Sequence, residues 1–183
     1  MHRLFVAIRQ PVAIISNILA IMSGVAAARW QDAAQLHITL RYIGEVDRHT
    51  AQDIAVALGH IPFPPFEISL SGVGSFQRKG RLDNLWAGVI PVHPLEHLHR
   101  KIDRACIQCG LPPEGRAYLP HMTLARFGHA AGPIDRFMAQ HAGLTTAPFT
   151  VRDFGLFESE LGQGGSTYQL IERYQAKESG APR

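Results

Sequence analysis

Two stretches of the chain nearly repeat each other: LHITLRYIGE (residues 36–45) and PHMTLARFGH (residues 120–129). Each contains the motif His-x-Thr-Leu, which begins at His37 and at His121, and each has a glycine seven residues after its histidine. A single His-x-Thr in a strand is usually an ordinary solvent-facing pair. The same motif written twice with the same glycine spacing predicts two equivalent strands of a duplicated structure, and these strands decide the fold.

Strand geometry determines which side chains of each motif lie together. Side chains two positions apart point to the same face of a strand. His37 and Thr39 therefore share one face, and His121 and Thr123 share the corresponding face of the second strand. The residues between them are apolar and take the opposite face. A His/Thr face opposite an apolar face is typical of a strand that lines a cleft.

The segments around the two motifs alternate between strand and helix patterns. The order is roughly βαβαββαβαββ, which is typical of a duplicated unit whose second copy begins near residue 83. Two copies related by a pseudo-two-fold axis would bring the two motif strands face to face. We expect strands over residues 4–8, 35–43, 66–73, 85–92, 118–127, 149–157 and 167–174, helices over residues 11–28, 47–59, 95–109 and 134–141, and loops over residues 74–84 and 158–166.

Length, composition and charge describe an ordinary globular protein. The chain has 183 residues, of which 46% are hydrophobic and 18% charged, so we expect one domain with a sizeable core. The formal net charge of +3 tolerates a polyanionic partner without requiring one. The uncharged run PVAIISNILAIMSGVAAA (residues 11–28) is interrupted by polar residues and glycine. This pattern favours a packed helix over a membrane span.

The two cysteines form the stretch CIQC, which ends at the C-terminal end of a helical pattern, directly before Gly110. A reactive pair of this spacing sits at a helix N-terminus, where the thiol pKa is depressed. We therefore expect Cys106 and Cys109 to be semi-buried helix positions. Because the chain has no disulfide framework, we expect a cytoplasmic protein.

The residue types of the motifs indicate a reaction. Histidine titrates near pH ~6.5, so one imidazole can act as a neutral base while the other acts as a charged acid. Threonine hydroxyls can donate hydrogen bonds to phosphoryl oxygens. Neither motif contains a carboxylate to hold a divalent metal or a thiol nucleophile. The set therefore fits the opening of a phosphodiester by acid–base catalysis without a metal.

Arg126 follows the second histidine by five residues. In a regular strand this odd offset would place it on the face opposite His121. It can still reach the cleft if the strand ends or bulges near Gly128. There its guanidinium would supply positive charge and a fork that matches phosphate; otherwise it is a surface arginine.

Longer segments around these motifs resemble a known superfamily. RWQDAAQLHITLRYIGEV (residues 29–46) and RAYLPHMTLARF (residues 116–127) are similar to the two signature blocks of the two-histidine (2H) phosphoesterases. Within that superfamily they most resemble the bacterial and archaeal RNA 2′,3′-cyclic phosphodiesterases, historically called 2′-5′ RNA ligases. LFVAIRQP (residues 4–11) and SELGQGGSTYQLIERY (residues 159–174) resemble the terminal blocks of that family. Ala117-Tyr118-Leu119 departs from it, because the family often has Pro-Phe and a variable residue there.

The resemblance implies roles for five residues. His37 would be the proton donor and His121 the proton acceptor, while Thr39, Thr123 and Arg126 would hold the phosphate. The family hydrolyses 2′,3′-cyclic phosphate at RNA ends to 2′-phosphate, and some members catalyse the reverse 2′-5′ ligation. Neither direction uses a nucleotide cofactor, and no metal ligand is expected among these five residues.

The resemblance also implies an α+β fold of two pseudo-symmetric lobes, each an antiparallel sheet with helices outside, around a central cleft. The whole chain, residues 1–183, would then form a single domain of two interleaved lobes. We expect a monomer that acts on RNA ends bearing 2′,3′-cyclic phosphate, with no cofactor, no membrane association and no obligatory protein partner.

Two other functions compete with this one. The first is a 2H phosphodiesterase that acts on a small cyclic phosphate of a nucleotide or sugar. The second is a noncatalytic module that binds RNA ends, although binding alone would not need an acid–base pair of histidines. The basic stretch from Arg78 to Arg81 either steers an RNA backbone or is a solvated loop. Tyr42 and Phe5 could each stack on a base, but aromatic residues in strands more often belong to the core.

Overall fold

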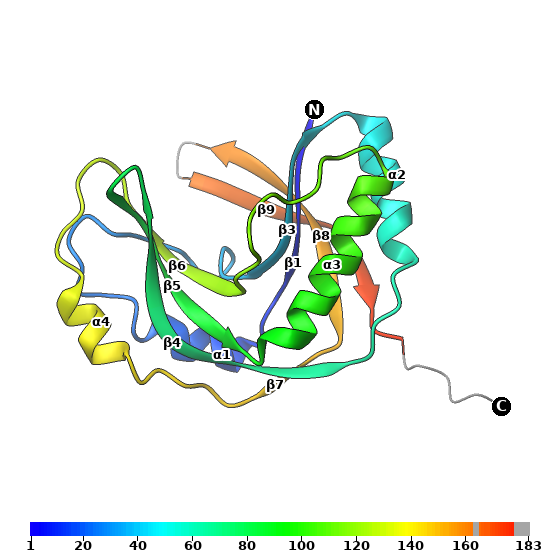
Figure 1. Cartoon of the computed structure of the whole chain (residues 1–183). Coiled ribbons are helices and arrows are strands. Elements are labelled where there is room, and N and C mark those ends of the chain that lie inside the picture. Colours follow the sequence, from blue (N-terminus) through cyan, green and yellow to red (C-terminus); the bar gives the residue numbers. More distant parts are fainter. Residues whose placement is uncertain (163–164, 178–183) are drawn as a thin grey trace.

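An antiparallel sheet runs through the molecule in the computed structural model, which describes residues 1–162 and 165–177 (Figure 1). The strand order is β7-β4-β5-β6-β3-β1-β8-β9, and β2 pairs with β6. The elements are β1 (His2–Ile8), α1 (Val12–Leu19), β2 (Arg29–Trp30), β3 (Ile38–Val46), α2 (Arg48–Gly59), β4 (Phe66–Arg78), β5 (Arg81–Ile90), α3 (Val92–Gln108), β6 (His121–Arg126), α4 (Asp135–His141), β7 (Phe149–Val151), β8 (Asp153–Gly162) and β9 (Gly165–Gln175).

The sheet consists of two halves that barely touch. The first lobe contains β3, β1, β8 and β9, and the second contains β6, β5, β4 and β7. One antiparallel residue pair, Ile38 with Met122, joins β3 to β6. Helices α2 and α3 cover the first lobe, and α4 packs on β4 of the second. The expected α+β fold of two lobes, each built on an antiparallel sheet, is confirmed.

Apart from β2, which pairs with β6 of the second lobe, and α3, which covers the first, the chain crosses between the lobes twice. After β3 and α2 it enters the second lobe as β4, and after β6, α4 and β7 it returns to the first lobe as β8. The order β1-α1-β3-α2-β4 is thus repeated by β5-α3-β6-α4-β8, apart from the short strands β2 and β7 and the last strand, β9. The second copy begins at Arg81, close to the expected boundary near residue 83.

The helix expected over residues 11–28 is wrong in its length, because α1 ends at Leu19. Gly24 and Ala27 both have positive φ, 81° and 61°, a conformation that an α-helix does not contain. The apolar run continues as irregular chain toward β2. No helix in residues 1–162 and 165–177 is both long and apolar enough to cross a membrane.

Residues 74–84 were expected to form a loop, and this expectation is also wrong. They complete the long hairpin of β4 and β5, in which Arg78 pairs with Arg81. Lys79 and Gly80 form the two-residue turn with φ of 52° and 74°. Positive φ at both central positions is the geometry that matches the twist of paired strands. A polar composition suggested a loop here, whereas the glycine marks only the turn.

Near the C-terminus the expected strand over residues 149–157 is divided. Arg152 separates β7, which pairs with β4 of the second lobe, from β8, which pairs with β1 of the first. The expected loop over residues 158–166 is mostly strand, since β8 reaches Gly162 and pairs there with Gly165 of β9. Residues 163–164 of that loop lie outside the described residues.

The core lies between the helices and the sheet. The apolar residues of the two motifs are buried, and so are Leu95, Leu98, Ile102 and Ala105 along α3. Asp47 caps α2, because its Oδ1 accepts a hydrogen bond of 2.9 Å from the backbone N–H of Thr50. Cys106 is buried and Cys109, the C-cap of α3, is half-buried, and both are free thiols.

Candidate active site

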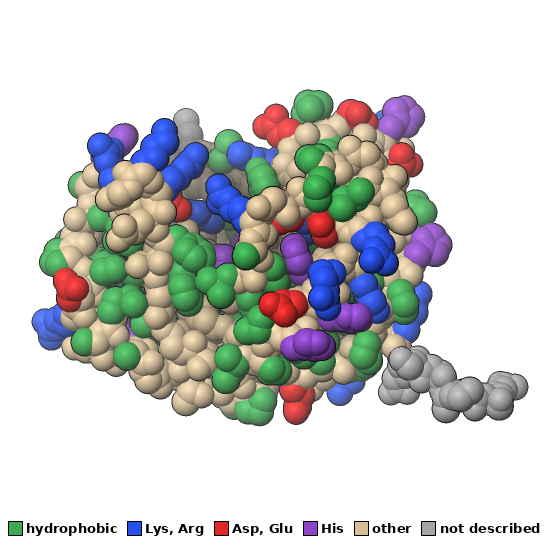
Figure 2. Space-filling view, viewed as in Figure 1, with side chains coloured by type: hydrophobic (Ala, Val, Ile, Leu, Met, Phe, Trp, Pro, Cys, Tyr) green, Lys and Arg blue, Asp and Glu red, His purple; other side chains and the backbone are tan. Residues whose placement is uncertain are grey.

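The two His-x-Thr segments meet where the lobes join. Because Ile38 pairs with Met122 in antiparallel register, the position of His37 lies across from Thr123 and that of Thr39 across from His121. Both histidines and both threonines are half-buried. A space-filling view shows a hollow between the lobes with Lys and Arg side chains along its rim (Figure 2). The sequence predicted this meeting of the two motifs.

The two imidazoles are held in the same way. Nδ1–H of His37 donates to the carbonyl oxygen of Gln35 at 2.6 Å, and Nδ1–H of His121 donates to that of Leu119 at 2.7 Å. In both cases the acceptor lies two residues before the histidine. Because a carbonyl oxygen only accepts, Nδ1 keeps its proton and Nε2 is the atom that titrates. Nε2 of His37 lies 3.1 Å from the hydroxyl of Thr39.

A β-bulge in β6 brings Arg126 to the cleft face. Ala125 pairs with Leu85 and Thr123 pairs with Trp86, so Leu124 has no partner of its own on β5. Leu124 and Ala125 are consecutive and both buried, which shifts the alternation of faces by one residue. Exposed Arg126 therefore returns to the side of Thr123. The bulge that the sequence required for this residue is present, slightly before the expected place.

The first motif contains the same bulge. Arg41 pairs with Val6 and Thr39 with Ala7, which leaves Leu40 as the extra residue of β3. Leu40 and Arg41 are both buried, and Tyr42 returns to the cleft side with an exposure of 50%. Tyr42 is therefore the counterpart of Arg126, five residues after the histidine. Its hydroxyl accepts a hydrogen bond of 3.0 Å from Nε of Arg3.

Aromatic rings surround both histidines. The ring of His37 lies 4.9 Å from Phe5 and 5.2 Å from Tyr168, between ring centroids. The ring of His121 lies 5.0 Å from Phe76 and 6.1 Å from Trp86. Phe5 is 5% exposed, which confirms its assignment to the core. The sequence analysis missed the other three because they come from strands that are distant in the chain, one of them in a segment read as a loop.

The cleft lowers the pKa of both histidines. Burial lowers the pKa of His37 to about 4, assisted by the positive charges of Arg9 and Arg126. Burial and Arg126 also lower the pKa of His121. The hydrogen bonds of Nδ1 to the two carbonyls act in the opposite direction. Both rings are therefore neutral near pH 7, and Arg9 is a cation of the site that the sequence analysis did not identify.

Side chains behind β3 hold its bulge in place. The hydroxyl of Tyr118 donates to the carbonyl oxygen of Thr39 at 3.1 Å, and Nδ1–H of His99 donates to that of Leu40 at 2.6 Å. The rings of Tyr118 and His99 stack at 4.2 Å and are nearly parallel. Tyr118 lies in the segment that departs from the family pattern, and its hydroxyl fixes the backbone of a motif residue.

Arg41 connects the two motif strands from the core side. It is 6% exposed, and its guanidinium lies 2.9 Å from Asp103 of α3 and 2.8 Å from Glu114. It also donates to the carbonyl oxygen of Pro112 at 2.7 Å. Pro112 and Glu114 belong to the segment between α3 and β6. Arg41, on the strand that follows His37, thus fixes the chain that leads to His121.

Comparisons with known proteins agree with this geometry. The family model described as "2′-5′ RNA ligase superfamily" matches residues 25–163. A protein of Aeropyrum pernix named RNA 2′,3′-cyclic phosphodiesterase is 31% identical over 147 residues, which cover 79% of this chain and 84% of that protein. A protein of Archaeoglobus fulgidus with the same name is 29% identical over 94% of this chain and 99% of its own length. The crystal structure of Escherichia coli LigT complexed with 3′-AMP superposes with a TM-score of 0.80 at 26% identity, over 97% of this chain and 99% of LigT.

Proposed function

The chain belongs to the 2′-5′ RNA ligase superfamily, and on this premise we propose that it is an RNA 2′,3′-cyclic phosphodiesterase. It opens a 2′,3′-cyclic phosphate at an RNA end and leaves a 2′-phosphate and a free 3′-hydroxyl. The observation that carries this proposal is the antiparallel meeting of the two His-x-Thr segments at Ile38 and Met122, with Nδ1 of each imidazole bound to a carbonyl. Two titrating Nε2 atoms in one cleft suit a reaction that needs a base and an acid.

The two histidines take opposite parts of the reaction. Nε2 of His121 accepts a proton from a water molecule as the water oxygen attacks phosphorus. The bond between phosphorus and O3′ breaks, and Nε2–H of protonated His37 donates its proton to O3′. In the microscopic reverse, the 3′-hydroxyl attacks the 2′-phosphate and water leaves. In 2′-5′ ligation, the 5′-hydroxyl of a second RNA attacks the cyclic phosphorus in place of water, and O3′ leaves with the proton of His37.

Thr39, Thr123 and Arg126 stabilise the phosphate. The hydroxyls of both threonines and the guanidinium of Arg126 lie on the cleft side of β3 and β6, where they can donate to the nonbridging oxygens. Donors placed before the reaction stabilise the charge of the transition state by about 3–4 kcal/mol each when they are strong. These groups act without a metal or a nucleotide cofactor.

The substrate supplies the charge that protonates the acid. His37 has a pKa of about 4 among the groups of the protein itself, so it is neutral near pH 7. A bound phosphodiester carries a negative charge that opposes the effects of Arg9 and Arg126 and raises this pKa. We therefore propose that His37 becomes protonated after the substrate binds. The base His121 is already neutral, as its role requires, because its pKa is lowered.

An assay with EDTA present tests the proposal. The substrate is an oligoribonucleotide that ends in 2′,3′-cyclic phosphate, and the product should carry a 2′-phosphate. His37→Ala and His121→Ala should each abolish turnover, whereas the matched control His97→Ala, at an exposed position of α3, should retain it. Binding without turnover would favour the noncatalytic module, and turnover of free cyclic nucleotides alone would favour the small-substrate enzyme.

We also propose that the protein acts as a cytoplasmic monomer without an obligatory protein partner. The support is its two free thiols, Cys106 and Cys109, which suit a reducing compartment. Size-exclusion chromatography with light scattering on active protein should give the mass of one 20.2 kDa chain. A dimer mass at the concentration of the assay would contradict this part of the proposal.

A further inference from the structure

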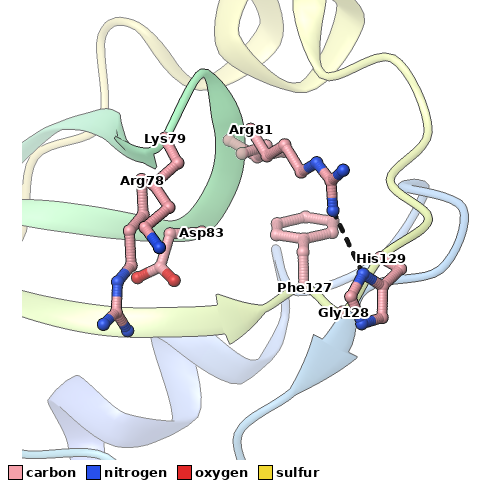
Figure 3. Close-up of a pocket in the computed structure, with 8 residues that line it drawn as sticks. Arg78, Lys79, Arg81, Asp83, Phe127, Gly128 and His129 are labelled. Atoms are coloured by element: carbon pink, nitrogen blue, oxygen red, sulfur yellow. Dashed lines mark hydrogen bonds between the residues drawn. The ribbon is translucent and has the colours of Figure 1, made fainter.

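A surface cavity lies at the tip of the β4–β5 hairpin. It is separate from the His/Thr cleft, the hollow between the lobes that contains His37, Thr39, His121 and Thr123. The volume of the cavity is about 450 Å³. Figure 3 shows Arg78 and Lys79 on one side of it, while Arg81 reaches across Phe127 toward His129 on the chain that follows β6. The residues that matter for its chemistry are Arg78, Lys79, Arg81, Asp83, Phe127 and His129.

The cations of this cavity are held by a well-defined hairpin. Arg78 and Arg81 are the last residue pair of the ladder, and Lys79 occupies the turn between them. The hairpin is fixed to the next strand by the hydrogen bond of 2.9 Å from the backbone N–H of Phe127 to the carbonyl oxygen of Asp83. The three cations therefore project from ordered backbone that belongs to the same sheet as the His/Thr cleft.

The positive charge of the cavity is not neutralised by the protein. Arg78, Lys79 and Arg81 are exposed, and in the part of the chain that the structure describes none lies within ion-pair distance of a carboxylate. Among the described residues, Asp83 is the only acidic one that lines the cavity, and it accepts a hydrogen bond of 3.2 Å from the amide of Asn84. Three neighbouring cations against one carboxylate favour an anionic ligand.

His129 orients one cation of the cavity. Nη1 of Arg81 donates a hydrogen bond of 3.1 Å to Nδ1 of His129. Figure 3 shows the guanidinium of Arg81 held toward His129 across the ring of Phe127. One cation is thereby oriented by a neighbour that does not neutralise it.

The cavity is adjacent to the phosphate-binding end of the cleft. Arg126 is the last residue of β6, and Phe127 to His129 follow it directly. Three residues of extended chain span at most about 10 Å, so an RNA strand can reach from one site to the other within very few nucleotides. Arg29 of β2 pairs with Arg126 and adds another cation at this end of the sheet.

We propose that this cavity binds the backbone phosphates of the single-stranded RNA that leads to the cyclic end. The inference rests on the proposed function and extends it from the terminal phosphate to the chain behind it. Contacts to phosphate are independent of base sequence and sensitive to salt. The enzyme should therefore prefer oligonucleotides over cyclic mononucleotides, and this preference should depend on the hairpin cations.

A triple variant, Arg78→Gln, Lys79→Asn and Arg81→Gln, tests the inference. Asn is used in the turn because it tolerates positive φ, and Gly80 is kept. For an oligoribonucleotide ending in 2′,3′-cyclic phosphate we expect KM to rise about tenfold or more, with kcat almost unchanged. For a 2′,3′-cyclic mononucleotide both constants should stay near those of the wild type. The slope of log(kcat/KM) against log[salt] for the oligonucleotide should flatten by up to about 2, since each single-strand contact contributes about 0.7.

A matched control removes three exposed arginines from the far side of the molecule, where α2 and α3 lie (Figure 1). Arg48→Gln, Arg100→Gln and Arg104→Gln change the net charge equally and should leave the KM for the oligonucleotide near wild type. An equal rise of KM in both triple variants would overturn the inference, because it would indicate a nonspecific charge effect. An unchanged KM in the hairpin variant, or an equal loss on the mononucleotide, would overturn it as well.

Direct binding separates this inference from the proposed function. The fluorescence anisotropy of a labelled oligoribonucleotide with an uncleavable 3′-phosphate reports affinity without turnover. Weaker binding to the hairpin variant than to the wild type supports the cavity as an RNA site even if no hydrolysis occurs. Equal binding to both proteins overturns the inference even if the wild type is an active phosphodiesterase. Circular dichroism spectra of both variants check that they are folded.

Discussion

The strand that follows His37 and the strand that follows His121 share their backbone but not their charges. Both imidazoles donate from Nδ1 to a carbonyl two residues earlier, and both strands bulge three residues after the histidine. After the bulge the first copy has Arg41 and Tyr42, and the second has Ala125 and Arg126. The arginine of the first copy points to the core and that of the second to the cleft. A displacement of one residue along a strand is enough to move an arginine from the cleft face to the core.

The strongest test of the comparison is to replace each histidine by glutamine. We expect His37→Gln and His121→Gln each to reduce turnover of a 2′,3′-cyclic oligonucleotide by about 10³-fold, within the range for general acid–base catalysis. The pH dependence of the residual rate should distinguish their roles. His121→Gln should remove the acidic limb of a bell-shaped profile, and His37→Gln the alkaline limb.

If His37→Gln instead removes the acidic limb and His121→Gln the alkaline limb, His37 is the base and His121 is the acid. A wild-type profile that is flat between pH 5 and 9 would contradict acid–base catalysis by this pair.

A smaller loss should follow at the positions five residues after each histidine. Arg126→Gln should reduce kcat by about 10²–10³-fold, as the removal of one preorganised donor does, and Arg126→Lys should retain part of the rate because the charge remains. Tyr42→Phe should have a much smaller effect, since it keeps the ring and removes only the contact with Arg3. The measurement is kcat for the same oligonucleotide. Equal losses at Arg126 and Tyr42 would mean that the two copies are functionally alike at this position.

The alternation of side chains along a strand was sufficient to place His37 and Thr39 on one face, and likewise their counterparts in the second motif. It depends only on the covalent geometry of a strand, and the tandem motif supplied the evidence that both strands matter. The bulges were not visible in the same way, because they arise from the register with β1 and β5. The sequence required a bulge to bring Arg126 into the cleft, but it gave no sign that Arg41 would turn toward the core.

The larger errors concern segments whose composition misrepresents their structure. Residues 74–84 are rich in polar and glycine residues, yet they pair as a hairpin because β5 is held by β6 on its other side. Phe76 beside His121 was missed for this reason. Residues 20–28 are apolar enough for a helix but contain positive-φ positions that only the tertiary fold reveals.

The two arginines also differ in what they do for stability. Arg41→Met should lower the free energy of unfolding by about 3 kcal/mol, because it leaves the carboxylates of Asp103 and Glu114 without their cation in a mostly buried site. Arg126→Met removes the same charge from an exposed position and should change stability by less than about 0.5 kcal/mol. Urea unfolding of both variants measures the difference. A similar loss in the free energy of unfolding for both variants would contradict a structural role confined to Arg41.

The smallest effect is expected from the unequal pKa values of the two histidines. The pKa of His37 is about 4 in the folded protein and ~6.5 in the unfolded chain, so between these values the unfolded chain binds more protons. The contribution of His37 to the free energy of unfolding is therefore fully present above pH ~6.5. It is lost as the pH falls toward 4, and the loss is about 2 kcal/mol at pH 5. His37→Gln should remove that part of the decrease. His121→Gln should remove less, because burial lowers the pKa of His121 less than that of His37 and Arg9 does not act on it.

Inorganic phosphate should reverse the effect at His37. An anion in the cleft opposes the two arginines and raises the pKa, so the protein with phosphate should lose less stability between pH 7 and pH 5 than the protein without it. Urea unfolding at both pH values, with phosphate or an equal ionic strength of chloride, gives the comparison, and NMR titration of the His37 ring follows the pKa directly. If phosphate binds but the pKa of His37 does not rise, the bound substrate does not cause the protonation of His37. The acid must then receive its proton in another way.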